Sequence, residues 1–203
     1  MVVILYDSYH ILSKEFPVPW PDDHKQETRD RIVESAAAAL RAKGLDGVSI
    51  AEIMAEAGLT HGGFYAHFKS KDELIGAALG RASRETIERL SNNRVASDRR
   101  IDAVIDTYLS AGHAAHPELG CPLAALGPEL ARASDPIRQG LAGGVAQRIE
   151  WVRQLLPEGE ATEENATAIV ATMLGGLLLA RMVAPDKSDA VLEATRSFID
   201  RAR

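Results

Sequence analysis

Two helix-start patterns in the first half of the chain constrain the local fold more tightly than any other feature of the sequence. Ser49 is followed three residues later by Glu52, and Ser70 is followed three residues later by Glu73. A serine and a glutamate at this spacing form a capping box, in which each side chain bonds the other residue's backbone N–H at a helix N-terminus. Between the two boxes, Gly58-Leu59-Thr60 ends one helix and caps the next. The segment therefore predicts two short helices joined by a three-residue turn.

Apolar side chains recur on one face of each of these short helices, so the two faces are expected to share a core. The positions are Ile50, Ile53, Met54 and Ala57 in the first helix, with Leu59, Phe64 and Phe68 from the turn and the second helix. This is the pattern of a helix-turn-helix, whose second helix fits a DNA major groove about 12 Å wide.

Helical periodicity also runs through the rest of the chain, with short breaks at glycine and proline. Aromatic residues make up only 5% of the chain, and no alternation typical of strands occurs. The predicted fold class is therefore all-α. The expected helices run from His24 to Gly44, from Ser70 to about Leu90, from about Arg99 to His113, from about Pro122, from Asp135-Pro136 to Leu156, from Thr162 to Ala184, and from Ser188 to the C-terminus.

Composition gives no support to a nucleic-acid partner by itself. The 23 Lys and Arg against 29 Asp and Glu give a formal net charge of -6, and no segment is strongly basic. If the chain binds DNA, helix termini and a few placed side chains must supply the positive potential. The one cysteine, Cys121, excludes an intrachain disulfide and favours a reducing cytoplasm. The apolar stretches are too short or too interrupted to predict a membrane span.

The run VSIAEIMAEAGLTHGGFYAHFKSKDEL from Val48, with Ile32 and Ala36 in the preceding helix, resembles the DNA-binding segment of the TetR family of transcriptional regulators. The resemblance covers about residues 28–75. It implies three parts: an N-terminal extension at 1–23, a three-helix DNA-binding domain at 24–70, and a larger helical effector-binding and dimerisation domain at 71–203. The residues expected to contact double-stranded operator DNA are Ser49, Thr60, His61, Gly62, Gly63, Tyr65, His67 and Lys71.

The paired glycines and the polar residues around them have two interpretations each. Gly62 and Gly63 each cost a helix about 1 kcal/mol relative to alanine, so they indicate close approach either of DNA or of a neighbouring helix. Tyr65 and His67 lie between Phe64 and Phe68, the expected core anchors, and are expected to point outward, toward DNA or simply toward solvent. His61 lies in the first turn, where recognition-helix side chains reach bases.

The resemblance implies that the C-terminal half binds a small-molecule effector and pairs as a homodimer through the last two helices, on a palindromic operator. A monomeric core is the alternative explanation of their apolar character. The candidate effector-pocket residues, each of which core packing also explains, are Tyr108, His113, His116, Cys121, Leu126, Trp151 and Met173. Cys121 precedes a proline at a predicted helix start, a position that favours a reactive thiolate, so a switch responsive to electrophiles or redox is a second hypothesis. A buried, inert cysteine is its alternative.

The leading hypothesis is thus a DNA-binding regulator, a repressor released by its effector. The sequence carries no zinc-protease motif, no phosphate-binding glycine loop and no nucleophile elbow, so we expect no catalytic residue, no metal and no cofactor. A helical protein-interaction module without DNA binding is the alternative from a different class.

Overall fold

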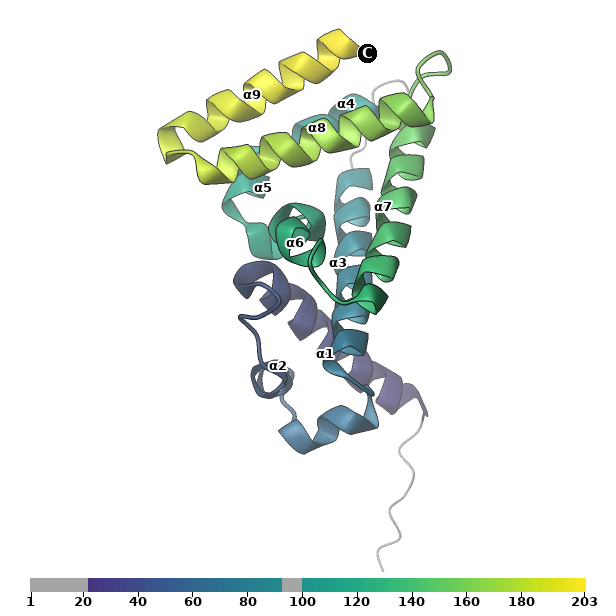
Figure 1. Cartoon of the computed structure of the whole chain (residues 1–203), viewed down its shortest axis with the longest axis vertical. Coiled ribbons are helices and arrows are strands. Elements are labelled where there is room, and N and C mark those ends of the chain that lie inside the picture. The colour runs from purple at the N-terminus through teal and green to yellow at the C-terminus, as the bar shows by residue number, and fades with distance from the viewer. Residues whose placement is uncertain (1–21, 93–99) are drawn as a thin grey trace, which may run out of the picture.

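A computed structural model of the chain describes residues 22–92 and 100–203, and every regular element in these two ranges is a helix. The N-terminal extension up to residue 21 and the expected helix start at Arg99 lie outside the described residues. The elements, shown in Figure 1, are α1 (Asp22–Lys43), α2 (Ile50–Glu56), the 3₁₀ helix η1 (His61–Ala66), α3 (Lys71–Ser91), α4 (Arg100–Tyr108), α5 (Ala111–Ala115), the 3₁₀ helix η3 (Pro117–Leu119), α6 (Pro122–Leu130), α7 (Asp135–Leu155), α8 (Glu163–Met182) and α9 (Pro185–Ala202).

The N-terminal core forms where α1 packs against α2 and the first half of α3. Figure 1 shows α2 and η1 at one end of the molecule, and the buried residues of this end belong to one cluster with those of α1 and α3. The fully buried side chains include Ile32, Leu40, Ile53, Met54, Phe64, Phe68 and Leu74. The apolar faces predicted for the helix-turn-helix therefore do meet in one core.

A second core lies between α4, α7, α8 and α9. The helices α3 and α6 contribute to both cores, so they connect the two halves of the chain. At the end of the molecule opposite η1, α8 and α9 lie side by side across the top of the view in Figure 1. α8 has the length and apolar composition of a membrane-spanning helix, a test that core helices of soluble proteins also pass.

Two predicted helix boundaries are wrong. The helix expected to reach His113 ends at Tyr108, because Ser110 adopts an extended conformation and its Oγ accepts the His113 N–H at 3.2 Å, which caps the separate helix α5. The last helix begins at Pro185 rather than Ser188, since proline fits the first helical turn, where its missing N–H is not needed.

Candidate functional site

The helix-turn-helix begins at the capping box that the sequence predicts. The Ser49 Oγ accepts the Glu52 N–H at 3.2 Å, and the Glu52 carboxylate accepts the Ser49 N–H at 2.8 Å. The Ser49 N–H and the Ser49 hydroxyl both donate to the Glu52 carboxylate, which holds the pKa of Glu52 below its ordinary value. After α2, Gly58 has a φ of 72°, a left-handed conformation that side-chain-bearing residues rarely adopt. The box and the glycine thus fix where α2 starts and how the chain turns into η1.

The second short helix, η1, is a 3₁₀ helix of six residues rather than a longer α-helix. Two glycines and only six residues give little helical propensity, so the tertiary packing of two phenylalanines must hold it in place. Phe64 and Phe68 are buried at 0% and 1% exposure, and their rings stack with centroids 5.8 Å apart. The aromatic pair therefore anchors η1 to the core and leaves its other side to solvent.

The two glycines of η1 differ in what surrounds them. A Cβ built on Gly62 would meet nothing within 4 Å, and one on Gly63 would lie 3.6 Å from the Met54 methyl group, which is ordinary van der Waals contact. Neither glycine is required by packing inside this chain, so close packing against a neighbouring helix does not explain them. At Gly62 the backbone is open to whatever approaches from outside.

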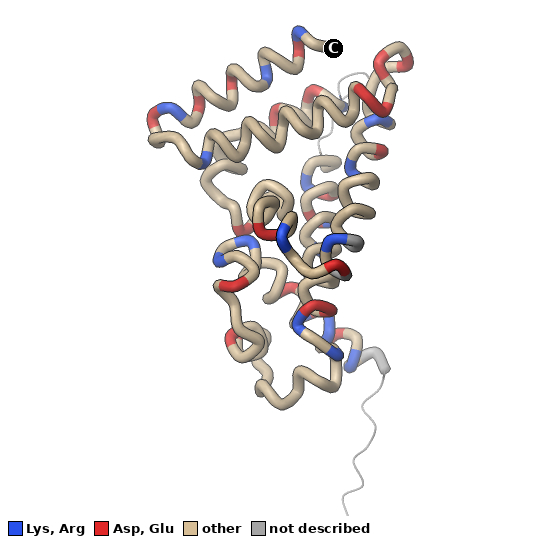
Figure 2. Tube along the Cα trace, viewed as in Figure 1, with Lys and Arg blue, Asp and Glu red and all other residues tan. Residues whose placement is uncertain are grey.

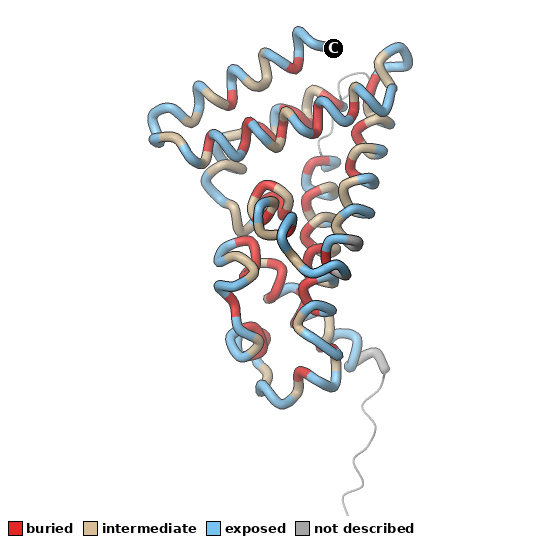
Figure 3. Tube along the Cα trace, viewed as in Figure 1, coloured by how far each residue is buried: buried red, intermediate tan, exposed pale blue. Residues whose placement is uncertain are grey.

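The exposed side of η1 carries no formal charge. His61 and Tyr65 are both exposed, and Tyr65 keeps 69% of its accessible surface. Figure 2 shows this segment in tan at the foot of the molecule, between α2 and the charged start of α3, and Figure 3 shows it largely exposed. Polar groups and open backbone thus form a small outward surface at the end of the molecule opposite α8 and α9.

His67 does not point outward as the sequence predicts. It is half-buried, and its Nδ1 is enclosed without a hydrogen-bond partner. Burial, and then the nearby charges of Lys25 and Arg29, lower the pKa of His67. Lys25 and Arg29 both belong to α1, so the His67 side chain lies close to that helix.

Two further predicted DNA contacts have roles inside the chain. The Lys71 Nζ donates to the Leu45 carbonyl at 3.2 Å, tying the start of α3 to the loop after α1. Thr60 occupies the N-cap of η1, but its side chain makes no capping hydrogen bond, which differs from the capping role that the sequence predicts. The DNA contacts of both residues stay predictions.

Arg29 of α1 is a residue that the sequence analysis missed. Its guanidinium lies 4.0 Å from the Phe68 ring centroid, donates to the His67 carbonyl, and pairs with Glu73 at 3.2 Å. One side chain therefore holds the end of η1 and the start of α3 together. No local pattern reveals it, because the partners lie about forty residues along the chain.

Five of the seven candidate pocket residues gather in the second core, and two do not. Leu126 is buried in the N-terminal core, facing the opposite side of α6, and His116 is exposed and pairs with Glu118 at 3.0 Å. The residues that gather are Tyr108, His113, Cys121, Trp151 and Met173.

His113 connects Tyr108 to Cys121. Its Nδ1 lies 2.7 Å from the Tyr108 carbonyl, its Nε2 accepts the Cys121 N–H at 3.0 Å, and its ring meets the Tyr108 ring edge-on. Both ring nitrogens of the neutral imidazole are therefore hydrogen-bonded. Burial lowers the pKa of His113 to about 4. The Cys121 side chain is fully buried at the N-cap of α6.

A small cavity of about 10 Å³, with room for about one water molecule, lies between α3, α4, α7 and α8. Most of the residues that line it are apolar, and Tyr108, Arg148 and Trp151 are the lining residues that carry a polar group. The lining residues are Leu90, Tyr108, Arg148, Trp151, Val152, Val170, Met173 and Leu174. Within the described residues, no group of three or more His, Cys, Asp or Glu side chains is arranged to hold a metal ion.

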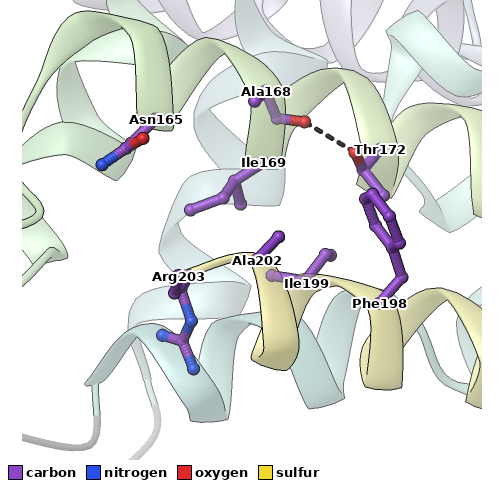
Figure 4. Close-up of a pocket in the computed structure, with 8 residues that line it drawn as sticks. All are labelled: Asn165, Ala168, Ile169, Thr172, Phe198, Ile199, Ala202 and Arg203. Carbon is purple, nitrogen blue, oxygen red and sulfur yellow. Dashed lines mark hydrogen bonds between the residues drawn. The ribbon is translucent and has the colours of Figure 1, made fainter.

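A second pocket, of about 50 Å³, lies between α8 and α9, where Thr172 and Phe198 face each other (Figure 4). Large apolar side chains stand exposed on the same two helices: Leu179 at 56%, Met182 at 74% and Phe198 at 54%. This apolar surface is uncovered in the single chain.

Comparison with known proteins agrees with this geometry. The family described as bacterial regulatory proteins, tetR family, matches residues 32–78, and a tetracyclin repressor-like C-terminal domain matches residues 98–198. A TetR transcriptional regulator from Chloroflexus aurantiacus J-10-FL is 30% identical with a TM-score of 0.71, over 87% of this chain and 94% of that one.

Two curated relatives are also transcriptional regulators. An uncharacterised HTH-type transcriptional regulator of Mycobacterium tuberculosis is 26% identical over 167 residues, 77% of this chain and 86% of that protein. The HTH-type transcriptional regulator TtgR of Pseudomonas putida is 40% identical over 57 residues, 28% of this chain and 27% of that protein.

Proposed function

This chain belongs to the TetR family of bacterial transcriptional regulators, and from that premise we propose that it is a cytoplasmic repressor that a small-molecule effector releases from a palindromic operator. Membership makes it a non-enzymatic, DNA-binding regulator with a helix-turn-helix. The direction of regulation, the effector and the residues in contact with DNA are the proposed part.

The outward surface of η1 carries the proposal for DNA contact. His61 and Tyr65 would reach base edges or phosphates, and the open backbone at Gly62 would approach a phosphate directly. The N-terminal amides of α2 and α3, at Ser49 and Ser70, would add positive potential without formal charge. This explains how a chain of net charge -6 would bind DNA.

We assign dimerisation to α8 and α9, with residues 71–203 as the regulatory domain and 24–70 as the DNA-binding domain. The exposed Leu179, Met182 and Phe198 are the support, because a second copy would cover these apolar side chains by two-fold symmetry. With dimerisation at one end of the chain and η1 at the other, the two recognition elements of a pair would both face one duplex (Figure 1).

A switch through Cys121 is the second candidate mechanism. Its support is the contact between the Cys121 side chain and the Tyr108 hydroxyl in the regulatory core. Complete burial of the thiol counts against it, since an electrophile would need the core to open first. Cys121→Ser would abolish electrophile-induced release of DNA if the thiol is the sensor, and would leave release unchanged if it is not.

Gel retardation of the DNA flanking the chain's own gene tests the proposal. We expect a complex of one dimer per palindrome that weakens steeply with salt. Tyr65→Ala would weaken it, whereas Leu119→Ala, an exposed residue on η3, would not. A monomer by light scattering, or no retardation of any flanking fragment at low salt, would overturn the proposal in favour of a protein-interaction module.

A further inference from the structure

A groove between α3 and α7 belongs neither to the exposed side of η1 nor to the apolar surface of α8 and α9. It has a volume of about 960 Å³ and is lined by α3 from Asp72 to Ile87, by α7 from Ile137 to Gln147, and by Arg29 of α1. At 1.5 Å of rise for each helical residue, this stretch of α3 is about 22 Å long. The groove is therefore long enough for about seven residues of extended chain.

Small residues leave this groove unfilled. Gly76 and Gly80 lie one turn apart on α3, and Gly143 and Gly144 lie on α7. A Cβ built on Gly76, Gly143 or Gly144 would meet nothing within 4 Å. Half-buried apolar side chains also line the groove: Ala77, Ile87, Leu123 and Leu141. Because these side chains remain partly exposed, an apolar segment that covered them would stabilise the fold.

The chain that precedes α1 is attached close to one end of the groove. α1 begins at Asp22, and Arg29, which lines the groove, follows about 10 Å further along this helix. Arg29 also pairs with Glu73 at 3.2 Å, so it marks the end of the groove at the start of α3. Residues 1–21 lie outside the described part of the chain, and 21 residues span up to about 70 Å when extended. Their length and their point of attachment bring the whole groove within reach.

Residues 1–21 are more apolar than a solvated linker requires. Twelve of the 21 are Val, Ile, Leu, Met, Phe, Trp or Tyr, a larger share than the 46% of hydrophobic residues in the whole chain. A segment of this length does not build a core of its own, so these side chains need a surface elsewhere. The apolar surface of α8 and α9 lies at the far end of the molecule from η1 (Figure 1), whereas the groove starts beside α1.

Charge gives a second, smaller reason to match the segment to the groove. Arg84 lines the groove, and within residues 22–92 and 100–203 no hydrogen bond or ion pair involves its exposed side chain. Residues 1–21 carry Asp7 and Glu15 against Lys14, a net charge of -1. An exposed ion pair contributes little, so the apolar contacts must supply most of the binding.

We propose that residues 1–21 dock in the groove between α3 and α7 of their own chain, with their apolar side chains against both helices and one carboxylate beside Arg84. The segment then joins α1 of the DNA-binding domain to α7 of the regulatory domain. This intramolecular contact does not depend on operator or effector binding, so it is tested on the free protein.

A photoreactive side chain tests where the segment binds. Full-length protein with p-benzoylphenylalanine in place of Tyr6 is irradiated, and the cross-linked residues are identified by mass spectrometry. We expect cross-links to α3 and α7 in the groove, and a mixture of isotope-labelled and unlabelled chains should show that each one joins residues of a single chain. Cross-links between chains would assign the groove to a second copy and overturn the proposal. Cross-links confined to other helices, or none at all, would leave the groove to another partner and also overturn it.

Tryptophan fluorescence gives an independent measurement. The chain has two tryptophans, so Trp151→Phe leaves Trp20, beside α1, as the one reporter. We expect Trp20 to emit at shorter wavelength, and to be quenched less by acrylamide, than in the same protein unfolded in urea. Emission and quenching equal to those of the unfolded chain would overturn docking of this part of the segment.

Variants that fill the groove separate docking from a change in fold. Gly80→Glu and Gly144→Glu place a charged side chain where a Cβ has room, and glutamate favours a helix more than glycine does. Both should keep the helical circular dichroism but lose the cross-links to α3 and α7 and the protection of Trp20. Gly112→Glu on α5, an exposed glycine outside the groove, is the matched control and should keep both signals. Arg84→Glu should lower the yield of cross-links. Cross-links and protection that persist in Gly80→Glu and Gly144→Glu would overturn the proposal.

Discussion

Replacing Gly62 by alanine separates the two reasons for a glycine in η1. The φ of Gly62 is not positive, and a Cβ there would meet nothing within 4 Å, so the methyl group strains neither backbone nor packing. Alanine also reduces the entropy of the unfolded chain, which stabilises by about 0.4–1 kcal/mol. The free protein is therefore expected to unfold at an equal or slightly higher temperature.

The same methyl group is expected to weaken DNA binding strongly. If the open backbone at Gly62 donates to a phosphate, a Cβ on that surface holds the phosphate away and removes a hydrogen bond to a charged group, which contributes about 1.5–3 kcal/mol. A dimer loses this bond twice, or at least about 3 kcal/mol. At 1.4 kcal/mol for each factor of ten, affinity for the operator falls by more than about 100-fold.

Fluorescence anisotropy with a labelled operator, paired with thermal unfolding of the same samples, measures both quantities. Gly143→Ala is the matched control, because Gly143 is an exposed helical glycine of α7 with no neighbour around its built Cβ. Gly58→Ala should lose stability instead, since its φ is 72°. A Gly62→Ala protein that is as stable as wild type and binds operator equally well would refute the reasoning.

Three further changes have defined outcomes. Ser49→Ala should lower the free energy of unfolding by about 1 kcal/mol, whereas Thr60→Ala, which removes no capping bond, should change it by less than about 0.5 kcal/mol in urea titration. Met182→Asp should convert the dimer to a monomer by light scattering and abolish operator binding, with Leu119→Asp as the exposed control. The pKa of His113 is about 4 in the folded chain and 6.5 in the unfolded chain, so between these pH values only the unfolded chain binds this proton. The free energy of unfolding should therefore fall by up to about 1.4 kcal/mol per pH unit from pH 6.5 to 4. His113→Gln should remove this slope in urea titrations at pH 7 and 5.

Much of the fold that depends on neighbouring residues is predictable from the sequence, although the break at Ser110 and the start of α9 at Pro185, which are also local, are not predicted. The box at Ser49, the turn at Gly58 and the start of α8 after Thr162 follow from backbone hydrogen bonds that a residue makes within four positions. The inward faces of α2 and η1 follow from apolar spacing, and the burial of Phe64 and Phe68 confirms them.

The parts that depend on distant residues were not predictable. Lys71 reaches Leu45, and Arg29 reaches both Phe68 and Glu73, because α1 and α3 cross beside η1. The sequence predicts a DNA contact for Lys71 from the family resemblance and from its place near a helix N-terminus, and neither of these reveals its bond to the Leu45 carbonyl. Arg148 carried no signal either, since an arginine in a mostly polar helix is ordinary until the tertiary fold buries it.

Hydrogen bonds around Gly120 link the DNA-binding half of the chain to the C-terminal half. Its carbonyl lies 3.5 Å from the Arg41 Nη1 of α1 and 3.4 Å from the Thr86 hydroxyl of α3, while the next N–H, of Cys121, bonds to His113 against Tyr108. A ligand that moves Tyr108 therefore acts on groups that also hold the DNA-binding half. Linkage then requires reciprocity: whatever factor the ligand removes from operator affinity, the operator must remove from ligand affinity. An effector titrated into the operator complex should bind more weakly by the same factor that it imposes on operator affinity, and unequal factors would mean that the two sites are not coupled through one equilibrium.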